Sequence, residues 1–280
     1  MARIVVTGGS GKAGRAVVND LVAHGEDVLS ADLVTAPGLA CDQVQADLTE
    51  LGQAVEVLRG ASAVVHLAAI PAPGLRPDEV TFRTNTESTY AVFSAAATLG
   101  LGRVVWASSE TVLGLPFERE PPAYAPIDEA HPARPEFSYA LSKLVSEEMA
   151  RQFNRWTGIT FVGLRFSNIM ERQDYERFPG FWGDPLQRKW NLWGYVDARD
   201  VAQSCRLALS SPLDGAKVFI VAAADTVMNR PSAELMAEVY PEVELRGEIA
   251  RFETLLSISN ARRLLGYEPA HSWRDELPGG

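Results

Sequence analysis

The sequence predicts an α/β fold with a doubly wound parallel sheet and a small C-terminal lobe. Two observations predict it: short β-branched runs alternate with longer amphipathic runs, and a glycine-rich turn follows the first apolar run directly. Such alternation requires a parallel sheet that is covered on both faces through right-handed crossovers. Ligands of these sheets bind beyond the carboxyl ends of the strands, so chemistry is expected in the loops that follow them.

Each element follows from its local pattern. The expected strands are the apolar runs at 4–6, 28–31, 63–68, 103–107, 160–165 and 217–221. The expected helices are the amphipathic runs at 14–24, 51–58, 86–99, 139–157 and 198–209. The strands are short and the helices longer, as crossover units require.

The turn after the first strand, residues 7–14, reads TGGSGKAG and predicts a dinucleotide site. Gly8 and Gly11 let the backbone approach a pyrophosphate, and Gly14 lets the next helix pack close to the sheet. The helix N-terminus then offers free N–H groups and a positive dipole end to the phosphates. The predicted cofactor contacts in this turn are Gly8, Ser10, Gly11, Lys12, Ala13 and Gly14.

The second strand ends in Asp32, which predicts NAD as the cofactor. A carboxylate there accepts hydrogen bonds from both ribose hydroxyls and repels a 2′-phosphate, so NAD is favoured over NADP. Asp47 and Leu48 follow a short polar stretch and are further candidates, for the adenine pocket.

Composition excludes several classes of protein. The 280 residues are 46% hydrophobic and carry a formal net charge of −10, without a basic stripe, which argues against a nucleic-acid partner. Cys41 and Cys205 are isolated, so neither a disulfide framework nor a metal site is expected. The first strand begins almost at Met1, and no apolar run reaches membrane-spanning length. We therefore expect a cytoplasmic protein without a membrane segment.

Three residues form a candidate hydride-transfer site. Ser109 follows the fourth expected strand, and Tyr139 and Lys143 lie four residues apart at the start of a helix. Residues at this spacing share one helical face, so the Lys143 ammonium is expected to favour the ionised form of Tyr139. Ser109 would then hold the substrate oxygen while Tyr139 moves the proton.

With these motifs the chain resembles the extended short-chain dehydrogenase/reductases, which include UDP-galactose epimerases, nucleotide-sugar dehydratases and uronate dehydrogenases. The resemblance implies a Rossmann fold that binds NAD, with Ser109, Tyr139 and Lys143 as the catalytic residues. It also implies that Asn168 faces the substrate. Further matching positions, which the resemblance assigns to the cofactor, are Asp47, Leu48, Leu67, Ala68, Ala69, Asn85, Tyr139 and Lys143.

The segment from Asn168 to Tyr195 indicates the size of the substrate. It is shorter than the stretch that grips UDP in the epimerases, which favours a free sugar, a sugar acid or a polyol. Arg177 lies where the resemblance places the arginine that binds a uronate carboxylate, although it is equally readable as a solvated loop charge. Glu110 and Pro71 replace residues of uronate dehydrogenases; Glu110 would repel a carboxylate or bind sugar hydroxyls instead.

The nearby aromatic residues have two open interpretations: they stack on a sugar ring, or they pack the small lobe onto the sheet. They are Phe178, Phe181, Trp182, Trp190 and Trp193. We expect residues 1–165 to form the NAD-binding domain with the catalytic residues. Residues 166–280 are expected to complete the sheet and form the small substrate-binding lobe.

The sequence favours a dehydrogenase that acts on a small sugar, sugar acid or polyol. It leaves open an epimerase or dehydratase that keeps its NAD bound, and a non-catalytic NAD-binding sensor. The resemblance further implies a homodimer built on the helix after Asn85 and the helix that carries Tyr139. The apolar residues expected to supply its surface are Tyr90, Val92, Phe93, Leu144, Met149 and Phe153.

Overall fold

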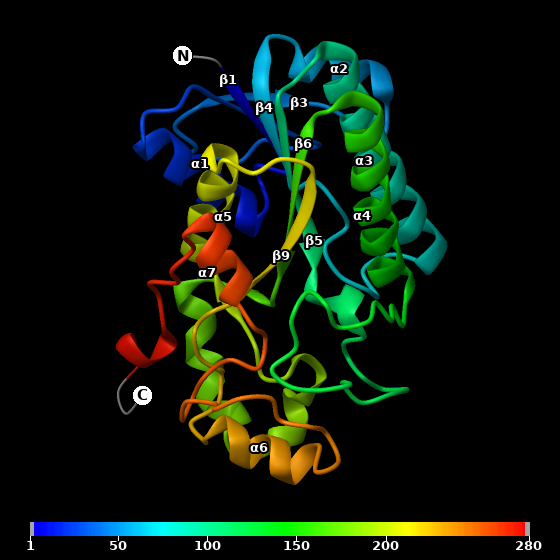
Figure 1. Ribbon diagram of the computed structural model, residues 1–280. Coiled ribbons are helices and arrows are strands. Elements are labelled where there is room, and N and C mark those ends of the chain that lie inside the picture. The colour runs from blue at the N-terminus through cyan, green and yellow to red at the C-terminus, as the bar shows by residue number, and fades with distance from the viewer. Residues whose placement is uncertain (1–2, 278–280) are drawn as a thin grey trace.

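The computed structural model describes residues 3–277 and contains a seven-stranded, fully parallel sheet in the order β3-β2-β1-β4-β5-β6-β9 (Figure 1). The strands are β1 (Arg3–Thr7), β2 (Val28–Asp32), β3 (Asp42–Gln45), β4 (Ala61–His66), β5 (Arg103–Ser109), β6 (Thr160–Phe166) and β9 (Ala216–Val221). The order reverses between β1 and β4, which is where a doubly wound sheet binds its ligand. The predicted α/β fold class is confirmed.

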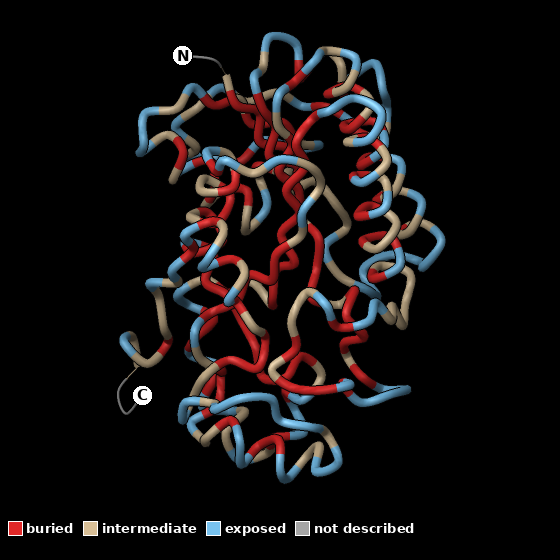
Figure 2. The backbone as a smooth tube through the Cα atoms, in the orientation of Figure 1, coloured by how far each residue is buried: buried red, intermediate tan, exposed pale blue. Residues whose placement is uncertain are grey.

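Helices cover both faces of this sheet (Figure 1). The helices are α1 (Lys12–Ala23), α2 (Leu51–Leu58), α3 (Asp78–Leu99), α4 (Ser138–Thr157), α5 (Ala198–Ser210), α6 (Ser232–Val239) and α7 (Ser259–Leu265). Contacts join α1 to α5 on one face, and α3 to both α2 and α4 on the opposite face. Figure 2 shows the buried residues concentrated along the strands and on the inward sides of these helices.

Strand residues alternate between two cores, because successive side chains of a strand point to opposite faces. In β1, Val6 joins the core beneath α1 and α5, and Val5 joins the core beneath α2, α3 and α4. The second core includes a group of aromatic rings, Phe93, Trp106, Phe153 and Phe161, and Gly163 on β6 makes room for it. A Cβ at Gly163 would lie 2.5 Å from the Trp106 ring, so only glycine fits beside this tryptophan.

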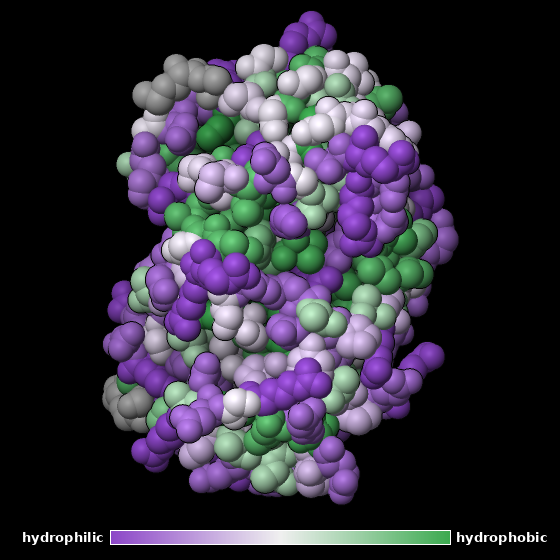
Figure 3. Space-filling model, viewed as in Figure 1, coloured by the Kyte–Doolittle hydropathy of each residue, from purple (hydrophilic) through white to green (hydrophobic). Residues whose placement is uncertain are grey.

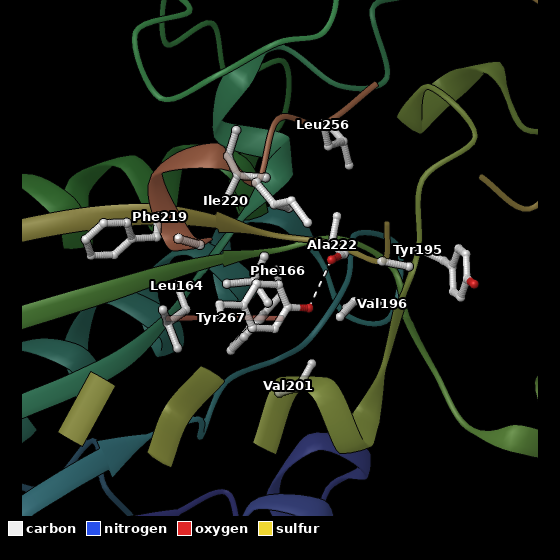
Figure 4. Packing of buried hydrophobic residues seen from close by; sticks show 14 of the residues in the cluster. Leu164, Phe166, Tyr195, Val196, Val201, Phe219, Ile220, Ala222, Leu256 and Tyr267 are labelled. Carbon is white, nitrogen blue, oxygen red and sulfur yellow. Dashed lines mark hydrogen bonds between the residues drawn. The ribbon is translucent and has the colours of Figure 1, made fainter. Parts of the chain in front are cut away.

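The first core continues into the C-terminal part of the chain (Figure 4). Tyr267 lies among residues of β6, β9 and α5, and its hydroxyl donates to the Ala222 carbonyl at 2.9 Å. The sheet and the C-terminal segments therefore share one hydrophobic core. Residues 216–221 supply the edge strand β9, so the second half of the chain contributes to the sheet itself.

The remaining elements form a lobe beyond the carboxyl ends of the strands, at the opposite end of the molecule from the start of β1 (Figure 1). They include α6, the two-stranded sheet of β7 (Ile169–Met170) and β8 (Val196–Asp197), and the 3₁₀ helices η1 (Glu110–Leu113), η2 (Arg172–Phe181), η3 (Pro185–Gln187), η4 (Lys189–Asn191) and η5 (Trp273–Asp275). Phe178 and Trp193 are fully buried in this lobe. Packing, rather than ligand stacking, accounts for these two aromatic residues.

Several boundaries differ from the sequence expectations. The edge strand β3 lies in a stretch without an apolar run, since its residues are partly exposed and polar. The helix expected over 86–99 begins earlier, at Asp78, where two acidic residues occupy its first turn. Val92, Phe93 and Phe153, expected on a dimer surface, are buried inside the subunit instead. No helix among residues 3–277 is long and apolar enough to cross a membrane.

Candidate functional site

The glycine-rich turn touches the loop after β4 at the point where the strand order reverses. Gly8 has a φ of +70°, and a Cβ there would lie 2.6 Å from the Ala68 nitrogen. At Gly14 a Cβ would lie 2.1 Å from the Gly8 carbonyl oxygen. Helix α1 begins at Lys12 without a side-chain cap, which leaves N–H groups of its first turn for an anion. The turn therefore fits a pyrophosphate.

Asp32 is oriented by the same turn. Its Oδ2 accepts from the Ser10 N–H at 3.0 Å, and its Oδ1 accepts from the Leu33 N–H at 2.7 Å. The hydroxyl of Ser10 donates to the Val34 carbonyl at 2.6 Å, which fixes the loop after β2 against the turn. Each carboxylate oxygen retains a lone pair for a ribose hydroxyl, as the NAD assignment requires.

Asp47 and Leu48 lie in the loop after β3. The Asp47 carboxylate accepts from the N–H and the hydroxyl of Thr49, at 3.0 and 2.7 Å, and these bonds lower its pKa. Leu48 is buried beneath it. The exposed carboxylate remains a predicted adenine contact.

A buried network holds the loop that carries Leu67, Ala68 and Ala69. The Thr7 hydroxyl lies 2.7 Å from His66 Nδ1 and accepts from the Leu67 N–H at 3.2 Å. Burial lowers the pKa of His66 to about 3, and the Lys143 charge adds to this, so the imidazole is neutral. Asn85 accepts from the Ile70 N–H at 2.8 Å and donates to the Ile70 carbonyl at 3.1 Å. The Asn85 side chain thus fixes this loop; its predicted cofactor contact stays a prediction.

Lys12 and Arg15 connect the turn to the lobe. Lys12 Nζ lies 2.5 Å from Asp174 Oδ2, and Arg15 Nη2 lies 3.2 Å from Glu171 Oε1. Both acidic partners belong to the start of η2. In this structure Lys12 therefore neutralises Asp174 of the lobe.

Ser109, Tyr139 and Lys143 come from the end of β5 and the first turns of α4. The Ser109 hydroxyl accepts from the Thr111 N–H at 3.2 Å and from the Thr111 hydroxyl at 2.9 Å, so its own proton is directed to the Tyr139 hydroxyl, whose pKa this bond lowers. Lys143 Nζ donates to the Ala107 carbonyl at 2.9 Å and lies 5.6 Å from the centre of the Tyr139 ring. These contacts place all three residues at the carboxyl edge of β5.

Helix α4 is locked in this position one turn beyond Lys143. The Glu147 carboxylate accepts from Arg165 Nε at 2.8 Å, from Arg165 Nη2 at 2.9 Å and from the Ser108 hydroxyl at 2.6 Å. All three residues are at most 5% exposed. A buried bidentate pair of this kind ties α4 to β5 and β6 and sets the height of Tyr139 along the sheet edge.

The electrostatics correct one expectation. Burial raises the pKa of Tyr139 to about 12; the hydrogen bond with Ser109 lowers it and the Glu110 charge raises it. Lys143 was expected to lower the Tyr139 pKa, but its ammonium is bonded to the Ala107 carbonyl, and burial lowers its own pKa to about 8. In this structure the loss of solvation therefore determines the direction in which the Tyr139 pKa shifts.

Four residues form what we call the buried polar cluster: Glu110, Ser167, Arg188 and Asn191. Glu110 Oε1 accepts from Asn191 Nδ2 at 3.4 Å. Burial raises the pKa of Glu110 to about 7, opposed by Ser167, Asn191 and the Arg188 charge. Burial likewise lowers the pKa of Arg188 to about 10, and Glu110 opposes that shift. The cluster places an acid and a cation behind the catalytic serine.

Asn168 and Arg177 occupy different environments. The Asn168 side-chain oxygen accepts from Nη1 and Nη2 of Arg188, both at 3.4 Å, so its amide is anchored to the buried polar cluster. The Arg177 side chain is 77% exposed and lies 3.8 Å from Asp174. Its predicted role toward the substrate remains a prediction. The sequence did not single out Arg188, and the aromatic residues Phe181 and Trp190 close to it in the chain were the available signal for its burial.

Three comparisons with known proteins agree with this geometry. Residues 4–222 match the model of the NAD dependent epimerase/dehydratase family. An NAD-dependent glucose-6-phosphate dehydrogenase of Haloferax volcanii is 27% identical over 64% of this chain and 74% of its own. An L-arabinose 1-dehydrogenase (NAD(P)(+)) of the same organism is 32% identical over 63% of this chain and 73% of its own.

A putative UDP-glucose 4-epimerase of Methanocaldococcus jannaschii is also similar, and the matched region spans only 57% of its length. Among solved structures, a short-chain dehydrogenase/reductase superfamily protein from Agrobacterium tumefaciens with bound NAD has a TM-score of 0.75 and 25% identity, over 97% of this chain and 94% of the other.

Proposed function

The chain belongs to the NAD dependent epimerase/dehydratase family, and on that premise we propose that it is a dehydrogenase that oxidises a small sugar, sugar acid or polyol and releases NADH. NAD, when bound, accepts the hydride that leaves the substrate carbon. We propose that the turn at 8–14, Asp32, Asp47, Leu48 and the loop at 67–69 hold it.

The observation that carries this proposal is the convergence of Ser109, Tyr139 and Lys143 at the carboxyl end of β5, with the Lys143 charge acting on His66 just before the loop at 67–69. Ser109 would donate its hydroxyl proton to the substrate oxygen when the substrate lies between Ser109 and Tyr139. Tyr139 takes the hydroxyl proton of the substrate as the carbon loses its hydride, so that alcohol and NAD become carbonyl, NADH and a proton. We propose that the Lys143 ammonium, one turn along the same face, together with the nicotinamide charge of bound NAD, offsets the desolvation that raises the Tyr139 pKa.

The size of the lobe favours a dehydrogenase over an epimerase. Between Asn168 and Tyr195 the chain forms only β7 and three 3₁₀ helices, which offer little surface for a nucleotide diphosphate. Similarity to the two sugar dehydrogenases supports the same choice. Similarity to UDP-glucose 4-epimerases supports the second candidate, an enzyme that returns the hydride to the same molecule.

The deciding experiment mixes purified protein with NAD and free sugars, sugar acids and polyols, and follows NADH absorbance. We expect net NADH with at least one compound, and its loss in Tyr139→Phe together with retained NAD binding. Absence of NADH across the panel, with NAD that stays bound through purification, would instead identify the hydride-returning enzyme. NADP in parallel tests the preference assigned to Asp32.

We also propose that the protein is a cytoplasmic homodimer that pairs through α3 and α4. Tyr90 is 55% exposed and Trp156 is 59% exposed, and both pack against Phe153, with ring centres 5.8 and 5.2 Å from it. Figure 3 shows hydrophobic residues on the side where α3 and α4 lie. Burying such rings between two copies is favourable. The cytoplasmic assignment is supported by two free cysteines among residues 3–277.

A further inference from the structure

The buried polar cluster contains unused hydrogen-bonding capacity. Within residues 3–277 four of its atoms lack a partner: Glu110 Oε2, Ser167 Oγ, Arg188 Nε and Asn191 Oδ1. Their residues are 3%, 3%, 6% and 0% exposed, respectively. Buried polar atoms are nearly always paired, so four atoms without a close partner in one place leave hydrogen-bonding capacity that a further polar group can use.

The cluster borders the reacting centre. Glu110 follows Ser109 directly in the chain, and its charge influences both Tyr139 and Arg188. The Arg188 guanidinium also contacts Asn168, the residue proposed to face the substrate. A substrate group that occupies the cluster is therefore part of the molecule on which Ser109 acts.

The unpaired atoms define the chemistry of that group. Asn191 Oδ1 can only accept a hydrogen bond, and so can Glu110 Oε2 when Glu110 is ionised. Arg188 Nε can only donate one, and Ser167 Oγ can do both. Hydroxyl groups both donate and accept, so vicinal hydroxyls satisfy this mixed set. A carboxylate only accepts, would leave the two acceptors unpaired, and would meet the negative charge of Glu110.

The covering segment is held in an uncommon conformation. Leu192 and Trp193, directly after Asn191, have backbone φ angles of 51° and 56°, which residues other than glycine rarely adopt. The rings of Phe181 and Trp190 lie over the Arg188 guanidinium, 5.2 and 4.8 Å from its central carbon. Both rings are partly exposed, and access of a hydroxyl group to the cluster requires them to move outward.

We propose that the buried polar cluster is a hydroxyl-binding subsite that selects an uncharged, polyhydroxylated substrate over the corresponding carboxylate, with Glu110 as the specificity residue. The opposite charges of Glu110 and Arg188 act on each other, so the subsite has no net positive charge to attract an anion. This inference rests on the proposed function, because it names the substrate class of the same site.

The test measures binding without turnover. Tyr139→Phe saturated with NAD is titrated calorimetrically with glucose and glucuronate, galactose and galacturonate, and arabinose. We expect at least one of the neutral sugars to bind. If that sugar is glucose or galactose, it should bind at least tenfold more tightly than its uronate. Introducing Glu110→Gln into the Tyr139→Phe protein should weaken binding of the neutral sugar by about tenfold or more. It should also reduce the difference in affinity between the neutral sugar and the uronate. Glu118 is exposed, so Glu118→Gln serves as the matched control. It should change neither the affinity for the neutral sugar nor the difference in affinity from the uronate.

The outcomes separate this inference from the proposed function. Tighter binding of a uronate, no binding of any sugar, or an affinity that Glu110→Gln leaves unchanged would each overturn the subsite. NADH formation by the wild type with another compound would still support the dehydrogenase in those cases. Sugar binding that depends on Glu110, without NADH formation by the wild type, would support the subsite and overturn the dehydrogenase. If Glu110→Gln fails to fold, Asn191→Ser removes another unpaired acceptor and carries the same test.

Discussion

Replacing Glu110 with glutamine should change how the stability of the protein depends on pH. Burial raises the pKa of Glu110 from 4.5 to about 7 in the folded state. A raised carboxyl pKa means that the native state binds the proton more tightly than the unfolded state, so this stabilisation is present at low pH and lost as pH rises toward 7. Between pH 5 and pH 8 the wild type should lose about 2.5 kcal/mol of unfolding free energy through this group, and the variant should not.

The assay is urea unfolding of wild type, Glu110→Gln and Glu118→Gln at pH 5 and pH 8. The altered contact with Asn191 shifts the stability of the variant by the same amount at both pH values. This shift cancels, because the comparison uses only how the stability difference between two proteins changes with pH. The control variant should follow the wild type. Equal pH dependence in wild type and Glu110→Gln would refute the reasoning, since the carboxyl would then titrate alike in both states.

Three further predictions follow from the site. Gly14→Ala should weaken NAD binding by tenfold or more, measured by fluorescence titration, because its Cβ would lie 2.1 Å from the Gly8 carbonyl; unchanged affinity would argue against the close approach. Asp32→Asn should lower NAD affinity by about tenfold and narrow the preference over NADP in the same titration, through loss of a charged acceptor; an unaltered preference would contradict the role of Asp32. Trp156→Glu should shift the protein to a monomer in sedimentation while its circular dichroism is retained, whereas a wild type that already sediments as a monomer would exclude the dimer.

The turn at 8–14 and the position of Asp32 were predictable because their function depends on local geometry. A glycine with positive φ after a strand, and an acid at the end of the next strand, are encoded within a few residues. The spacing of Tyr139 and Lys143 likewise placed both on one helix. In each case the information lies in a single segment of chain.

Other features depend on contacts between distant segments. The desolvation that raises the Tyr139 pKa was not foreseen, because helical spacing carries no information about burial. Arg188 reads as a loop charge until the lobe packs Phe181 and Trp190 over it. The strand β3 has no hydrophobic period to detect, since its partly exposed edge position removes the need for one. Tertiary context decides all three.

The ion pairs of Lys12 with Asp174 and of Arg15 with Glu171 have a consequence for biosynthesis. The two residues of the first pair are 162 positions apart in the chain, and those of the second pair are 156 positions apart. Lys12 and Arg15 are among the first residues to be synthesised. The helix that follows the glycine-rich turn must therefore await more than half of the polypeptide before its charged partners exist. We expect a ribosome-bound chain that ends at residue 165 to lack both ion pairs. The glycine-rich turn should therefore acquire its contacts with η2 late in folding.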